Sequence, residues 1–155
     1  MTFRITGLDP APFRPLFDLD DEALAACGVV RVTADADFGF PDRVGLCDAR
    51  AGETLLLLNY EHQPAPPPYR SRHAIFVREG AAEPFDAIAL IPPALRSRAL
   101  SLRSFTAGGE MLDADLVDGR EAEALIERLL ADPRAAYVHA HYAKRGCYAA
   151  LIRRA

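Results

Sequence analysis

The stretch Glu53-Thr54-Leu55-Leu56-Leu57-Leu58-Asn59-Tyr60-Glu61-His62 decides the predicted fold. Its four consecutive leucines put apolar side chains on both faces of an extended chain, which is typical of a central strand covered on both sides. The stretch then turns polar and runs into Gln63–Pro68, where proline removes backbone donors and favours a stiff, extended loop. We therefore expect a buried strand that ends in polar side chains beside a rigid loop.

Other segments with strand character lie on both sides of this one. They cover residues 29–33, 44–47, 73–77, 99–106 and 111–117, followed by a terminal hairpin with strands over 137–143 and 147–153. Residues 85–91 fit either a strand or a helix, and they end at a pair of prolines.

Helical patterns are fewer. Asp20 can cap a helix over Asp21 to Cys27. Asp118 precedes a second helix, whose apolar stripe consists of Ala122, Leu125, Ile126, Leu129 and Leu130. Strands thus outnumber helices by about eight to two and do not alternate regularly with them. We predict an α+β fold, with a mainly antiparallel, strongly curved sheet or partial barrel and about two main helices.

Composition indicates an ordinary globular protein. The chain has 155 residues, 50% hydrophobic and 26% charged, with a formal net charge of −4. This length is typical of one domain, which we expect to span residues 1–155. The acidic balance argues against nucleic acid as a partner, because duplex binders carry basic stripes that neutralise phosphates.

The sequence also predicts a location. No apolar run approaches the roughly 18 residues that a membrane span needs, so we expect no membrane association. The first residues lack the pattern of a secretory signal, and Cys27, Cys47 and Cys147 are odd in number and widely spread. These features predict a cytoplasmic protein.

Several short pieces, taken together, resemble a known family. They are Gly7-Leu8-Asp9-Pro10, Gly52-Glu53, Leu56–His62, Tyr69-Arg70, Ala74–Glu79 and Gly146–Ala150. The chain resembles, over nearly its whole length, the uncharacterised bacterial domain-of-unknown-function family 1203. The resemblance implies a small single-domain bacterial protein with no assigned activity and no catalytic residues to carry over. Asp42 stands where the resemblance leads us to expect a cysteine, which argues against a metal or thiol role for that loop.

The first candidate site is His139-Ala140-His141 in the terminal hairpin. Residues two apart on a strand share a face, so both imidazoles could converge on one metal ion. A third ligand must come from elsewhere, with His62, His73, Glu61 or Cys147 available. A three-residue hairpin loop would place Cys147 on the histidine face, and a two-residue loop would place it opposite. Alternatively, both histidines are simply hydrogen-bonded core or surface residues.

The second candidate is Tyr60-Glu61-His62, at the end of the leucine strand. Tyr60 and His62 share one face of the strand and Glu61 faces away. Histidine can act as an acid or base near neutral pH. The alternative is ordinary capping of a strand end.

The third candidate is cationic. Arg70, Arg72 and His73 precede one predicted strand, and Arg96, Arg98 and Arg103 surround another. Guanidinium groups bind carboxylate or phosphate through paired hydrogen bonds, so a small anionic ligand is a reasonable partner. Surface pairing with the excess of acidic residues is the alternative.

These candidates combine into one leading hypothesis, a polar cleft that binds a small anionic molecule and, as a further option, a divalent metal held by His139 and His141. Its ligand-binding residues would be Tyr60, Arg70, His73 and Arg103. If the protein is an enzyme, His62 or His141 is the acid or base, Arg70 clamps the anion, and hydrolysis or isomerisation is the broad reaction class. The sequence does not identify a cofactor, and its Asp113 to Gly119 segment lacks the spacing of a calcium loop.

The competing hypothesis is a non-catalytic interaction module or homodimer. It would use the proline loop Pro64–Pro68 and the exposed edge of the terminal hairpin, because a free strand edge readily pairs with a partner.

Overall fold

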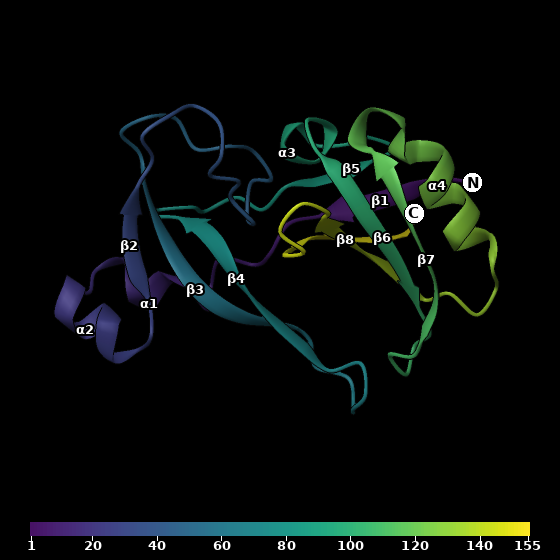
Figure 1. Cartoon of the computed structure of the whole chain (residues 1–155), viewed down its shortest axis with the longest axis horizontal. Helices are drawn as coiled ribbons and strands as arrows, with labels where there is room; N and C mark the ends of the chain where they lie inside the picture. The colour runs from purple at the N-terminus through teal and green to yellow at the C-terminus, as the bar shows by residue number, and fades with distance from the viewer.

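The computed structural model describes residues 1–155 and contains two open antiparallel sheets (Figure 1). The six-stranded sheet has the order β5-β1-β9-β8-β6-β7, and the three-stranded sheet has the order β2-β3-β4. The strands are β1 (Phe3–Thr6), β2 (Val30–Thr33), β3 (Thr54–Gln63), β4 (Ser71–Arg78), β5 (Asp86–Ile88), β6 (Ala99–Phe105), β7 (Met111–Asp118), β8 (Tyr137–Tyr142) and β9 (Tyr148–Arg154). All paired strands run antiparallel, which confirms the α+β class with a mainly antiparallel sheet.

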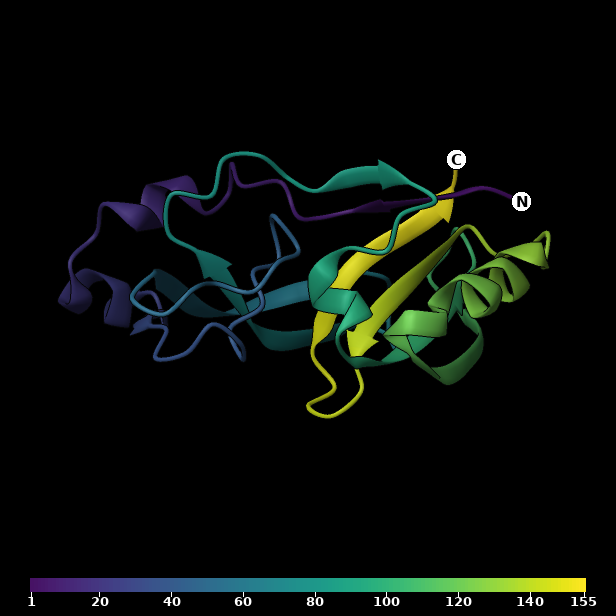
Figure 2. The same ribbon diagram turned by 90° about the horizontal axis from the view of Figure 1, so that it is seen from above.

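The helices are short except for one. They are α1 (Arg14–Phe17), α2 (Asp21–Ala26), α3 (Pro93–Arg96) and α4 (Ala122–Ala131), and the 3₁₀ turn η1 (Gly119–Glu121) precedes α4. The Asp20 carboxylate caps α2 by accepting a hydrogen bond from the Ala23 amide, as its position predicts. The apolar stripe predicted for α4 is buried against the large sheet (Figure 2). No helix has the length and apolar character that crossing a bilayer requires.

Some predictions need correction or refinement. Both sheets are open, so no barrel closes, and two short helices, α1 and α3, accompany the predicted α2 and α4. Residues 44–47 form a buried loop and not a strand. Leu46 has a positive φ of 53°, and the apolar pattern of this segment arises because Val44 and Leu46 are buried. Both strands of the terminal hairpin lie inside the large sheet, so the hairpin has no free edge for a partner strand.

The central strand of the small sheet behaves as the leucine run predicts. β3 lies between β2 and β4, and Leu55, Leu56 and Leu58 are buried. Leu56 and Leu58 pack in one apolar cluster, whereas Leu55 packs in another with Ala34 and Ala49. Both faces of β3 are therefore covered along its first half, and its second half continues toward the large sheet (Figure 1).

The two faces of the large sheet differ in chemistry. Val138, Ala140 and their neighbours on β9 and β6 belong to the main apolar core with α4. The alternate residues on the opposite face include His139 and His141, paired across to Arg103 and Ser101 of β6. Because side chains alternate along a strand, the large sheet presents a polar face on the side away from α4.

A buried arginine joins the two sheets. Arg43, in the loop between β2 and β3, is 1% exposed and has no carboxylate partner. Its guanidinium donates to the carbonyl of Tyr148 at 2.7 Å, to the carbonyl of Pro41, and to Sγ of Cys147 at 3.1 Å. The Arg43 backbone amide in turn donates to the Phe76 carbonyl of β4. One residue thus bonds to the small sheet through its backbone and to the large sheet through its side chain.

The segment after β1 also packs closely against this loop. A Cβ atom at Gly7 would lie 1.9 Å from the carbonyl oxygen of Val44, a distance that real atoms do not reach. Glycine lets the two backbones meet, and the Leu8 amide donates to the Arg43 carbonyl at 2.8 Å.

We predict that Arg43→Met lowers the free energy of unfolding by roughly 2–5 kcal/mol, because it leaves two buried carbonyl groups without a donor. The matched control is Arg50→Met, since Arg50 is exposed and its side chain makes no hydrogen bond; we expect a change within about 0.5 kcal/mol. Urea unfolding of both variants measures the difference. Equal midpoints for the two variants would contradict a structural role for the Arg43 contacts.

Candidate functional site

Three histidines meet where the end of β3 crosses the polar face of the large sheet. The His62 ring centroid lies 6.0 Å from that of His139 and 5.0 Å from that of His141. Tyr148 joins them: its ring stacks on His62 with centroids 5.2 Å apart and lies 5.1 Å from His139. The folding of two distant stretches therefore brings His62, His139 and His141 together, as the leading hypothesis requires.

The hairpin between β8 and β9 explains why Tyr148 takes this place. Its register shifts between Ala140 and His141, so that His141 lies opposite Tyr148. Gly146, with φ of 79°, allows the turn, and its carbonyl lies 2.9 Å from Nδ1 of His141. Residues 143–147 connect β8 to β9, so neither predicted loop length describes the hairpin. Cys147 packs in the main apolar core, away from the histidines, and contacts Arg43.

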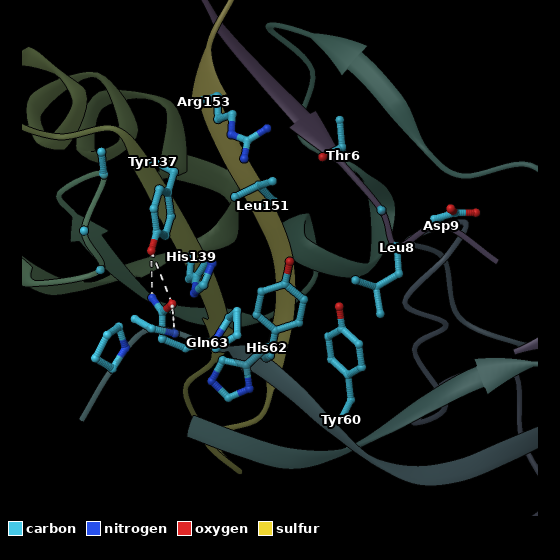
Figure 3. A pocket seen from close by; sticks show the side chains of 18 residues that line it. Thr6, Leu8, Asp9, Tyr60, His62, Gln63, Tyr137, His139, Leu151 and Arg153 are labelled. Atoms are coloured by element: carbon cyan, nitrogen blue, oxygen red, sulfur yellow. Dashed lines mark hydrogen bonds between the residues drawn. The ribbon is translucent and has the colours of Figure 1, made fainter. Parts of the chain in front are cut away.

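A cleft of about 720 Å³ opens beside this cluster (Figure 3). Strand β1 and the segment after it, the end of β3, the proline loop, the β6–β7 turn, β8 and β9 all contribute. The lining residues with polar side chains are Thr6, Asp9, Tyr60, His62, Gln63, Tyr137, His139, Tyr148 and Arg153. Tyr60, His62 and His139 of the sequence prediction thus line one cleft.

The proline loop forms part of the cleft wall. Pro64, Ala65 and Pro66 line the cleft. The Gln63 amide nitrogen donates to the Tyr137 hydroxyl at 2.9 Å, which fixes the start of this loop to β8 (Figure 3). A Cβ atom at Gly109 would lie 2.2 Å from Cβ of Ala65, so the β6–β7 turn packs directly on the loop. These contacts hold the loop against the large sheet.

Burial keeps the three imidazoles neutral near pH 7. Burial, followed by the positive charge of Arg103, lowers the pKa of His62 from 6.5 to about 4. Burial and the neighbouring His141 lower the pKa of His139 to about 3, and burial likewise lowers that of His141 to about 3. A histidine with so low a pKa is a weak base, because a base works best when its pKa lies near the working pH. The imidazoles are therefore better suited to hydrogen bonding than to proton abstraction.

Besides Nδ1 of His62, two residues in the cleft wall, His139 and Tyr148, carry polar groups that have no partner in the protein. His139 is 5% exposed, its ring makes no hydrogen bond, and its Nδ1 atom is shut off from solvent. Since a buried N–H without an acceptor is unfavourable, we assign the proton to Nε2, where it can be donated. Tyr148 is 4% exposed. Its hydroxyl makes no hydrogen bond within the protein but keeps some contact with solvent. Burial raises the pKa of Tyr148, so this hydroxyl is a proton donor at neutral pH.

Arg153 supplies the only positive charge among the lining residues. It is exposed, forms no ion pair, and its side chain reaches the cleft beside Tyr137 and Leu151 (Figure 3). It lies directly across from Arg4 of β1, whose charge is balanced by Asp86. Burial is the main cause of the low pKa of His139 and of the raised pKa of Tyr148; the charge of Arg153 adds slightly to the first effect and opposes the second, so both groups lie within its field.

The remaining predicted residues lie outside this cleft. Arg70 is largely exposed and pairs with Glu61 on the other face of β3. Arg103 is half-buried, with Oγ of Ser101 as its side-chain partner at 3.2 Å, and its charge lowers the pKa of all three buried histidines. His73 lies opposite Tyr60 on β4. The structure therefore places Arg103 near the three histidines and leaves Arg70 apart.

The histidine pair does not acquire a third metal ligand. No group of three or more His, Cys, Asp or Glu side chains is placed so that it could share one ion. Cys147 points to the core, and Glu61 faces away from His62 to bind Arg70. The suggested partners thus leave His139 and His141 without a completed metal site.

Sequence reasoning missed Tyr148, Arg153 and Tyr137. Tyr137 lies two residues before His139 and therefore on the same face of β8. Arg153 lies two residues after Leu151, which pairs with His139, and so it faces the same side of the sheet. The alternation of side chains along the two predicted strands could have indicated both residues. Tyr148 could not be placed in this way, because the register shift that brings it opposite His141 has no clear pattern in the sequence.

We predict that acid destabilises the protein through these histidines. Their folded pKa values lie below the unfolded value of 6.5, so stability is fully present above about pH 6.5 and falls as the pH decreases toward 4. Between pH 8 and pH 5 each neutral buried histidine accounts for a loss of roughly 2 kcal/mol. Urea unfolding of His139→Gln at both pH values should show a loss smaller by about that amount.

The control for this measurement is Tyr137→Phe, which changes the same cleft without removing an imidazole. Its loss between pH 8 and pH 5 should equal that of the wild type. If His139→Gln and the wild type lose the same stability over this range, His139 is not held neutral by the fold.

Comparison with known proteins places the chain in a family. Residues 39–154 match the family described as Protein of unknown function (DUF1203). The match includes β3, β8 and β9, whereas the Gly7–Pro10 part of the sequence resemblance lies outside it. No curated protein and no solved structure matches the chain. Since the matched region covers most of the chain, the protein belongs to the DUF1203 family.

Proposed function

We propose that the cleft binds a small anionic molecule, with Arg153 as its charged contact and Tyr148 and His139 as hydrogen-bond donors. The observation that carries this proposal is an arginine with no carboxylate partner in the same cleft as two buried, unpartnered donors. A chain with 22 acidic and 18 basic residues has carboxylates to spare, yet none pairs with Arg153. The anion would take the place of that missing partner.

The donor set favours an anion over a cation or a neutral molecule. A guanidinium, a phenol hydroxyl and an imidazole Nε2–H all donate, and a bound carboxylate or phosphate oxygen accepts. Arg103 lies outside the lining, and its charge adds to the positive potential at His62 and His139. Asp9 is the one carboxylate in the lining, and it is exposed, with Oδ1 accepting from the Ala11 amide. Arg153 and the nearby Arg103 together therefore outnumber the one carboxylate in the lining.

Binding is a better-supported role than catalysis. His62 and His139 line the cleft, but their low pKa values make them poor general bases at neutral pH. A bound anion would raise these pKa values by favouring the charged imidazole. Proton transfer by His62 would then depend on the ligand being present, which keeps an acid–base role open only within the complex.

Thermal melts against a panel of carboxylates, sulfate and phosphate test this proposal. A ligand that binds only the folded protein should raise the melting temperature by about 3–6 °C at ten times its dissociation constant. Arg153→Gln should abolish the shift. Arg145→Gln, which removes an equal charge from the exposed hairpin turn, should retain it.

Tyr148→Phe refines the test. Loss of one hydrogen bond should weaken binding roughly 3- to 10-fold without abolishing it. A panel that produces no shift in the wild type, or shifts of equal size in Arg153→Gln, would exclude anion binding at this cleft. Elemental analysis of the purified protein at the same time would reveal a bound divalent metal.

A further inference from the structure

We propose that the ligand of this cleft is an amphiphilic monocarboxylate, with its carboxylate at Arg153 and an aryl or alkyl body along Leu151, Leu8 and Tyr60. This inference rests on the proposed anion binding and adds the chemical class of the ligand. Three properties of the cleft carry it: its size, its balance of charge and the half-buried apolar side chains that line it.

The size of the cleft argues for an organic ligand. At about 720 Å³ it lies within the range of roughly 300–1,000 Å³ that is typical of small-molecule sites. A sulfate or phosphate ion would contact Arg153 and leave most of this space filled with water. A ligand that uses the cleft must therefore have a body beyond its charged group.

The charges in the lining match a single negative charge. Arg153 and Asp9 are the only lining residues that are charged at neutral pH, because burial lowers the pKa values of His62 and His139 to about 4 and about 3. One guanidinium can compensate one carboxylate. A second negative charge on the ligand would have no lining cation and would approach Asp9 at the exposed end, which costs free energy.

The rest of the surface is suited to an apolar body. Leu8, Leu151, Tyr60 and Tyr137 are half-buried and line the cleft, and each keeps some apolar surface in contact with water. Covering such surface with a ring or an alkyl chain is favourable in proportion to the area removed from water. Aromatic walls also favour planar groups, which contact them face to face or edge to face.

The geometry separates the two ends of the ligand. Arg153 and Leu151 are neighbours on one face of β9, and Thr6 lies across from Leu151 on β1. Leu8 follows on the same chain segment, and Tyr60 lies beyond it on β3, so that charged and apolar contacts succeed one another along the cleft (Figure 3). A carboxylate at Arg153 with a body directed toward Leu8 and Tyr60 satisfies both ends at once.

Isothermal titration at pH 7.5 with three probes tests the inference on the wild-type protein. The probes are 3-phenylpropionate, propionate and inorganic phosphate. We expect 3-phenylpropionate to bind roughly tenfold or more tightly than propionate, because its ring covers apolar surface that propionate does not reach. Phosphate, largely a dianion at this pH, should bind more weakly than 3-phenylpropionate.

Two matched variants locate the apolar body. Leu8→Ala should weaken 3-phenylpropionate roughly 3- to 5-fold and leave propionate unchanged. Leu16→Ala is the control, since Leu16 is another half-buried leucine packed on the same apolar cluster, but it lies outside this cleft. Arg153→Gln should abolish binding of both carboxylates.

The outcomes separate this inference from the proposed function. If phosphate or propionate binds as tightly as 3-phenylpropionate and requires Arg153, the cleft binds anions but the inference about the ligand class is wrong. If 3-phenylpropionate binds equally well to Arg153→Gln, the carboxylate contact is wrong. If none of the three probes binds the wild type, anion binding at the cleft fails together with the inference.

Discussion

The buried guanidinium of Arg43 is the contact on which the rest of the structure depends. It donates to the Tyr148 carbonyl of the large sheet, while its own backbone amide bonds to the small sheet. A charge buried without a carboxylate partner is costly, so this position is tolerated only because carbonyl oxygens, the Cys147 sulfur and the face of the Tyr142 ring surround it. Tyr148, whose carbonyl accepts this hydrogen bond from Arg43, also stacks its ring on His62. Arg43 therefore connects the two sheets and also positions a residue of the candidate site.

This arrangement explains why the interface between the sheets is polar. The apolar face of the large sheet is occupied by α4, so the end of β3 meets the other face, which carries His139, His141 and Arg103. A joint made only for stability would bury apolar side chains or satisfy each polar one. Here the Nδ1 atoms of His62 and His139 have no partner, and the fold bears their cost. Two of the three buried polar atoms without a partner, Nδ1 of His62 and Nδ1 of His139, therefore lie beside one cleft, and the third is the Tyr142 hydroxyl, whose ring contacts Arg43.

Local patterns predicted the elements, and tertiary contacts decided what the patterns could not. The leucine run gave a central strand because both faces of β3 are covered, and Asp20 capped α2 because its side chain needs only the next three residues. Residues 44–47 looked like a strand for the same apolar reason, but their backbone bonds go to several different segments rather than to one ladder. An apolar pattern reports burial, and only pairing makes a strand.

The candidate site shows the same division between local and distant information. Residues on one strand, such as His139 and His141, could be predicted to share a face, and the end of β3 could be predicted to expose Tyr60 and His62. Which arginine would reach them depended on sheet order. Arg70 is nearer to His62 in sequence, yet it lies on the other face of β3 beside Glu61. Arg153 is far away in sequence, but β9 lies next to β8, and this places its charge in the cleft. Because charge acts through space, the pairing of strands rather than the spacing of residues selects the arginine that an anion would meet.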